Sequence, residues 1–148
     1  MATPTTKLTP KQLIDAAKAP LLAYSAKDWD KVKRSITSNF IYDEVGTARK
    51  VQGIDNVVPL WQEWAAAMPD SKATIHAAHV SGNTVVLELT WTGTHTGPLN
   101  LPTGTVAGTG KGIDMRAAAI FEITGGKAST QRHYFDMATM LNQLGIMG

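Results

Sequence analysis

The sequence contains no cysteine among its 148 residues. This absence excludes disulfide frameworks, thiolate zinc sites, iron–sulfur clusters and cysteine nucleophiles, and it is compatible with a cytoplasmic protein. An excess of one charge is also missing, because 14 Lys and Arg stand against 12 Asp and Glu. Nucleic-acid binders gather basic residues on one face, so we expect no nucleic-acid partner. No apolar run is long enough for a membrane span, and we expect no membrane contact.

The chain has the length of one compact domain. Its apolar fraction of 43% is sufficient for an ordinary core, and no internal repeat or linker is visible. Residues 1–8 lack the cationic and apolar segments of a signal peptide, and we expect them to be a flexible leader. Residues 9–148 are then expected to form a single domain.

Three helices are predicted in the first half of the chain. A capping box marks the start of the first helix at Pro10, and apolar residues follow at helical spacing. Pro20 is expected to kink or split this helix. A short second helix is predicted after Asp28, and a third over residues 55–68. Pro59 limits where the third helix can start, because its missing N–H is tolerated only in the first turn.

Strands are predicted to dominate the remainder, over residues 40–45, 48–51, 74–80, 84–95, 111–124 and 127–135. The Gly/Pro/Thr-rich segment 97–110 is expected to be a loop that forms a flap over a cavity entrance. Asp136 is expected to cap a short C-terminal helix. Helices followed by strands favour an α+β fold, in which a curved antiparallel sheet packs against the three N-terminal helices.

Several short segments carry a family resemblance: WTGTHTG at 91–97, TGK at 109–111, GK at 126–127, RHYFD at 132–136 and LNQLG at 141–145. Together with the helices, this pattern resembles the SnoaL-like polyketide cyclases, or ester cyclases, of the nuclear-transport-factor-2-like fold. The resemblance implies a cone-like α+β domain with an internal cavity for an apolar small molecule. It also implies a homodimer that pairs through the sheet.

The resemblance further implies the position of the reaction. Characterised polyketide cyclases carry an acid/base aspartate on the last strand, and here His133 occupies that position while Asp136 matches a second acidic position. A histidine can transfer protons at neutral pH. The implied activity is cofactor-free acid/base chemistry (cyclisation, isomerisation or hydration) on an apolar carbonyl-bearing ligand. A non-catalytic ligand-binding module of the same fold is the alternative.

Each candidate site residue also has a purely structural interpretation. His133 either faces the cavity as a proton shuttle or is satisfied by a backbone carbonyl or a carboxylate. Asp136 either orients His133 or only caps the C-terminal helix. His95 either lines the cavity mouth or bonds to its own glycine-flanked turn.

The charged residues on the strands are similarly ambiguous. Arg116 either helps to stabilise an enolate in the cavity or forms an outer ion pair with Asp114 or Glu88. Asp43 and Glu44 are adjacent and so point to opposite faces, and we expect an exposed pair.

Five aromatic residues are expected either to line the cavity or to pack in the core: Tyr24, Trp61, Trp64, Trp91 and Tyr134. The hydroxyl of Tyr134, like His95, is a further candidate for electrophilic help. The histidines lack metal-ligand spacing, so neither a metal site nor a cofactor is predicted.

Overall fold

The computed structural model describes residues 7–146. Its helices are α1 (Pro10–Ser25), α2 (Trp29–Ser35), α3 (Ile54–Ala67) and α4 (Met137–Gln143), with a single 3-10 turn, η1 (Val45–Thr47). Its strands are β1 (Ile36–Glu44), β2 (Arg49–Gln52), β3 (Lys72–Ser81), β4 (Thr84–Thr94), β5 (Leu99–Leu101), β6 (Gly104–Val106), β7 (Gly112–Thr124) and β8 (Lys127–Phe135). Residues 1–6 of the expected leader lie outside the described residues, and Leu8 already packs against the core.

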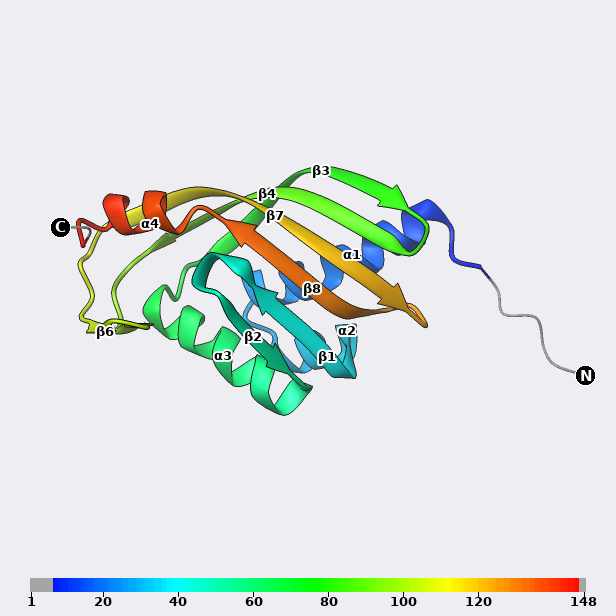
Figure 1. Ribbon diagram of the computed structural model, residues 1–148, viewed down its shortest axis with the longest axis horizontal. Coiled ribbons are helices and arrows are strands. Elements are labelled where there is room, and N and C mark those ends of the chain that lie inside the picture. The colour runs from blue at the N-terminus through cyan, green and yellow to red at the C-terminus, as the bar shows by residue number, and fades with distance from the viewer. Residues whose placement is uncertain (1–6, 147–148) are drawn as a thin grey trace, which may run out of the picture.

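Six strands form one curved sheet in the order β2-β1-β8-β7-β4-β3 (Figure 1). The predicted α+β class is confirmed, but the sheet is mixed because β1 and β8 run parallel. Two parallel strands need a long connection, and here everything from β2 to β7 separates them in the chain. This parallel pair places a strand from the first half of the chain beside the last strand, and part of the candidate site lies on these two strands.

Prolines lie inside two of the helices. α1 continues through Pro20, whose buried ring faces the cavity, so packing offsets the lost hydrogen bond and the helix is not split. α3 begins at Ile54, which puts Pro59 in the second turn rather than the first. The carbonyl group that Pro59 cannot bond to belongs to exposed Asp55, where water can replace the missing donor.

Two clusters of apolar side chains pack inside the cone. The larger lies between α1, α3 and the inner face of the sheet, where Leu87, Leu89 and Phe121 are fully buried. The smaller lies at the other end, where Leu99 and Met140 meet around the C-terminal helix. Between these clusters the side chains do not fill the interior, and a cavity remains.

The segment 97–110 contains the small hairpin β5–β6 rather than a loop alone. A Cβ atom at Gly97 would overlap the carbonyl oxygen of Ala66, so glycine permits this close approach to α3. On the opposite side, α4 is fastened to β7 by the Gln143 amide, which accepts from Asp114 N–H and donates to Asp114 C=O at 2.9 Å each. The hairpin and α4 together close this end of the cone.

Candidate functional site

A cavity of about 640 Å³, in part open to solvent, lies between α1, α3 and the inner face of the sheet. The lining is mainly apolar and aromatic, and consists of Pro20, Leu21, Tyr24, Tyr42, Glu44, Trp61, Trp64, Met68, Ser71, Trp91, Ile113, Met115, Gln131, His133, Phe135 and Met140. Of the five aromatic residues expected there, Tyr134 alone does not line it.

His133 lies in the wall of this cavity, on β8. Alternation along the strand places Gln131, His133 and Phe135 on one face, and in the structure this is the inner face. The neighbour of His133 on β7 is Ala119, whose small side chain leaves room for the imidazole ring. The ring lies 4.7 Å from that of Phe135, and only 6% of the residue is exposed.

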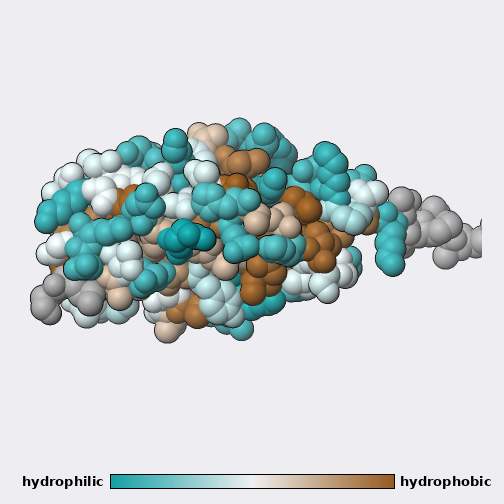
Figure 2. Space-filling model, turned by 90° about the horizontal axis from the view of Figure 1, so that it is seen from above, coloured by the Kyte–Doolittle hydropathy of each residue, from teal (hydrophilic) through white to brown (hydrophobic). Residues whose placement is uncertain are grey.

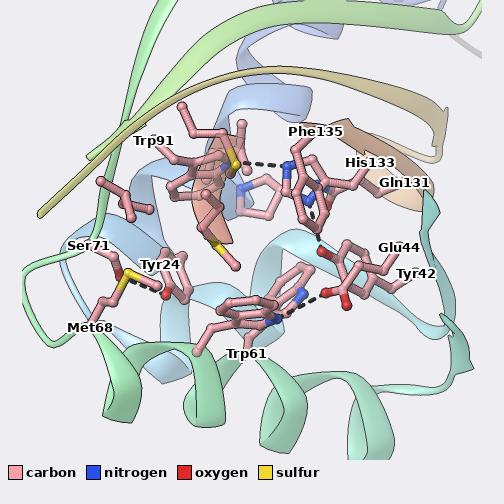
Figure 3. A pocket seen from close by; sticks show the side chains of 16 residues that line it. Tyr24, Tyr42, Glu44, Trp61, Met68, Ser71, Trp91, Gln131, His133 and Phe135 are labelled. Carbon is pink, nitrogen blue, oxygen red and sulfur yellow. Dashed lines mark hydrogen bonds between the residues drawn. The ribbon is translucent and has the colours of Figure 1, made fainter. Parts of the chain in front are cut away.

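Both ring nitrogens of His133 have side-chain partners (Figure 3). The indole N–H of Trp91 donates to Nε2 at 3.0 Å. Because an indole nitrogen only donates, Nε2 is unprotonated and a neutral ring carries its proton on Nδ1. Nδ1–H then donates to the Tyr42 hydroxyl at 2.8 Å. The imidazole is therefore held in one tautomer and one orientation.

Glu44 lies next to Tyr42 and completes the group of polar residues His133, Tyr42 and Glu44. Its side chain is completely buried, and Oε2 accepts from the Trp64 indole at 3.0 Å. Oε1 accepts from the Arg49 guanidinium at 2.8 Å and from the Thr47 hydroxyl. These donors supply the charge and hydrogen bonds that a buried carboxylate requires.

The expected exposure of the pair Asp43 and Glu44 is thus wrong for Glu44. β1 has a neighbour on each side, β2 and β8, so its inward residues are enclosed. Tyr42 and Glu44 share the inward parity, while Asp43 faces outward and is half-buried. The sequence pattern contained this parity, but the strand that would pair with β1 was not evident from it.

Burial controls the ionisation of the central pair. It lowers the pKa of His133 to about 4, although the negative charge of Glu44 acts in the opposite direction. Burial also raises the pKa of Tyr42 well above its usual value, and the charge and hydrogen bonding of neighbouring Glu44 raise it further. At neutral pH the site therefore holds a neutral imidazole and a neutral phenol beside a carboxylate.

A second polar pair lies across the cavity from His133 (Figure 3). The hydroxyls of Tyr24 and Ser71 are 2.7 Å apart and buried. Burial raises the pKa of Tyr24 to about 12, and the hydrogen bond with Ser71 opposes this in part. Ser71 was not identified from the sequence, since a lone serine after a turn carries no periodic signal.

The structure places His95 and Asp136 outside the cavity. His95 is fully buried beside residues 109–111, and its Nδ1 accepts from the backbone N–H of Thr109 at 3.2 Å. It is thus a turn histidine and does not line the mouth. Asp136 is exposed and caps α4 by accepting from Thr139 N–H at 3.0 Å. That hydrogen bonding, chiefly with the Thr139 side chain, lowers the pKa of Asp136.

Arg116 and Tyr134 also lie outside the cavity, because their strand parity directs them to the outer face. Arg116 is exposed opposite Thr90 on β4, and Tyr134 is 44% exposed. Among residues 7–146, no ion pair joins Arg116 to an acidic side chain, and Glu88 bonds to His79 at 2.8 Å instead. Electrophilic help in the cavity must come from other donors.

No group of three or more His, Asp or Glu side chains within residues 7–146 could hold a metal ion. No described helix is long and apolar enough to cross a membrane.

Comparison with known proteins agrees with this fold. The model of the family described as SnoaL-like polyketide cyclase matches residues 14–144. The fold is similar to TsrD from Streptomyces laurentii, at 19% identity and a TM-score of 0.80, with 95% of this chain and 100% of that chain covered. It is also similar to an LEH-like epoxide hydrolase of M. tuberculosis, at 22% identity and a TM-score of 0.71, with 90% of each chain covered.

A third solved structure also has a similar fold. It is a protein of Catenulispora acidiphila DSM 44928 with a ketosteroid isomerase-like fold, in complex with trimethylamine. The two chains are 16% identical with a TM-score of 0.75, and 94% of this chain and 95% of that one are covered. No curated protein sequence matches the chain.

Proposed function

The chain belongs to the SnoaL-like polyketide cyclase family, and on this premise we propose that it is a small-molecule enzyme that moves a proton on an apolar carbonyl-bearing ligand. The observation that carries the proposal is the Trp91–His133 hydrogen bond within an apolar cavity. It sets a neutral base and a neutral donor side by side, where one ligand can engage both.

Proton removal begins with a competition for the indole N–H. A ligand carbonyl near Trp91 can accept this hydrogen bond and thereby release the lone pair of His133 Nε2. That lone pair takes the proton from the carbon next to the carbonyl, and the carbonyl oxygen takes up the negative charge of the enolate. Trp91 stabilises this charge in a cavity lined mainly by apolar side chains.

Tyr42 and Glu44 support the protonated histidine. When Nε2 gains a proton, the imidazolium keeps its Nδ1–H bond to Tyr42, whose hydroxyl can donate onward to Glu44. A base that is oriented by a second group and neutralised by a third is a recurring catalytic arrangement. This role replaces the one expected of Asp136, which lies outside the cavity.

An enolate is the intermediate of each reaction class that we expected. In cyclisation the enolate carbon attacks a second carbonyl, and Nε2–H protonates the resulting alkoxide. In isomerisation the proton returns to a different carbon atom. In hydration, Nε2 takes a proton from water as its oxygen adds to the far carbon of a conjugated double bond, and Nε2–H then protonates the enolate that forms at the carbon next to the carbonyl. All three need only side chains of this chain for the proton transfer.

The test is turnover by wild type and His133→Ala on a panel of polyketide-like methyl esters, measured as a function of pH. We expect turnover to fall by about 100-fold or more in the variant. Arg116→Ala is the matched control, since Arg116 is exposed on the outer face. Unchanged turnover in His133→Ala would end the proposal for this residue.

A non-catalytic ligand-binding module is the second candidate, favoured by the fact that both His133 nitrogens already have partners. Native mass spectrometry of the purified protein can identify a retained ligand. A ligand that binds equally well to His133→Ala and is recovered unchanged after incubation supports the binding module.

We also propose that two copies pair through the outer face of the sheet. Central outward positions on β4 and β7 are apolar and half-buried, at Val86, Ala118 and Ile120, and Tyr134 lies on the same face. Figure 2, seen from above, shows brown areas among teal ones on the side where β3 and β4 lie. Light scattering at micromolar concentration should give twice 15.9 kDa, and a monomer contradicts the pairing.

A further inference from the structure

The buried hydroxyls of Tyr24 and Ser71 form a hydrogen-bonded pair in which one O–H donor is unused. Two hydroxyl groups carry two donors, and the single bond between them uses only one. Among the described residues each hydroxyl has only the other as its side-chain partner. Both residues line the cavity, so the remaining O–H and the free lone pairs are within reach of a molecule in it.

Neighbouring groups hold the two hydroxyls in place. The Ser71 N–H donates to the Met68 carbonyl at 2.9 Å, and the Ser71 carbonyl accepts from the ammonium group of Lys27. The Tyr24 ring packs edge-on against Trp29 and Trp91, with centroids 5.8 and 5.5 Å away. Polar groups that are fixed before a ligand arrives lose little entropy when they bind it.

Packing alone gives no reason for these hydroxyls. Phe and Ala in their places would fill nearly the same space and avoid the desolvation of two polar groups. The pair faces the pocket from the side opposite to Tyr42, Glu44 and His133 (Figure 3). The walls between the two sides are apolar or aromatic, and Trp61 and Trp91 provide flat faces for a ring.

From this arrangement we propose that the Tyr24–Ser71 pair is a second anchor, which binds an oxygen atom at the end of the ligand remote from His133. The substrate class is then a flat, apolar ring compound with a carbonyl at one end and a hydroxyl or carbonyl oxygen at the other. This inference rests on the proposed function, because it takes the carbonyl at His133 as its first contact. Tyr24 and Ser71 are specificity residues in this scheme and take no part in proton transfer.

Matched aryl ketones test the anchor. The probes are acetophenone, 2-acetylnaphthalene and 2-acetylphenanthrene, each compared with its analogue that has a hydroxyl on the edge remote from the acetyl group. For at least one ring size, calorimetry should show that wild type binds the hydroxylated probe about three- to tenfold more tightly. Tyr24→Phe and Ser71→Ala should abolish this preference and leave the affinity for the plain ketone within about twofold.

The double variant should lose no more than either single variant, since the two hydroxyls act as a unit. Circular dichroism and thermal melting establish that each variant is folded. The inference is overturned if wild type binds none of the three pairs, if it shows no preference within them, or if the variants keep the preference. His133→Ala separates the two proposals, because it should retain the preference even where it abolishes turnover.

Discussion

The indole nitrogen of Trp91 donates to Nε2 of His133 across 3.0 Å, inside a cavity lined mainly by apolar side chains. Trp91 comes from β4 and His133 from β8, and β7 lies between these strands in the sheet. The hydrogen bond therefore crosses the inner face of the sheet over the intervening strand. It sets the tautomer of the histidine and at the same time occupies the lone pair that a proton would use.

Replacing Trp91 by Phe tests this relationship without a ligand. Burial is the main cause of the low pKa of His133. The indole N–H bonds only to the unprotonated Nε2 and so also favours the neutral ring, and its loss should move the pKa upward from about 4. NMR titration of the His133 ring protons measures the shift. Trp29→Phe removes an indole that does not line the cavity and should leave the titration unchanged.

The same variant should also reduce turnover if Trp91 stabilises an enolate. Loss of one donor to a developing oxyanion costs about 100- to 1,000-fold in kcat. KM should change much less, because the neutral ground-state carbonyl gains little from the donor. Equal effects of Trp91→Phe and Trp29→Phe on kcat would show that the indole only packs.

The depressed pKa of His133 predicts how stability depends on pH. In the unfolded chain the group titrates near 6.5 and in the folded protein at about 4. Between these values the unfolded state binds more protons, so the free energy of unfolding decreases as pH falls through this window. At about pH 4.5 the loss relative to neutral pH is about 2–3 kcal/mol.

Urea unfolding of wild type and His133→Gln at several pH values measures this contribution. The glutamine variant lacks the titrating group, so its stability should fall less steeply between about pH 6.5 and 4.5. Identical slopes would mean that His133 takes up its proton as easily in the folded protein as in the unfolded chain.

Local patterns predicted one side of the site. The alternation along residues 127–135 was sufficient to place His133, Gln131 and Phe135 on a common face, because side-chain direction in a strand depends on its immediate neighbours. The caps at Thr9 and Asp136 were likewise readable, since each involves residues three positions apart.

The partners of His133 required information that no local pattern holds. Tyr42 is 91 residues away in the chain and reaches His133 through the parallel pairing of β1 with β8. Nothing in either segment specifies the other as its neighbour. The antiparallel sheet expected from the sequence did not place the two strands side by side. The same pairing buries Glu44, whose carboxylate accepts a hydrogen bond from Trp64 Nε1.

Glu44→Gln should destabilise the protein and its neighbour Asp43→Asn should not. Glutamine keeps the shape of the Glu44 side chain, but it loses the charge that faces Arg49 and turns one acceptor into a donor toward Trp64 or Thr47. Loss of hydrogen bonds to a buried charged group gives an expected decrease of about 2–3 kcal/mol in the free energy of unfolding.

Asp43 provides the matched control for this carboxylate, since it is adjacent in β1 and faces outward. Its change to Asn should alter stability by less than about 0.5 kcal/mol. Urea titrations at neutral pH compare the two. Equal, small effects would indicate that Arg49, Trp64 and Thr47 are as well satisfied by an amide as by a carboxylate.

Asp136→Ala separates the two roles considered for this aspartate. As the N-cap of α4 it accepts from Thr139 N–H at 3.0 Å, and its loss leaves that helix end unsatisfied. We expect a lower midpoint of thermal unfolding and unchanged turnover, because Asp136 is exposed and does not line the cavity. Asp136→Ser restores a capping oxygen without the charge and should recover most of the thermal stability. A loss of turnover in both variants, with the fold intact, would instead assign Asp136 a part in orienting His133.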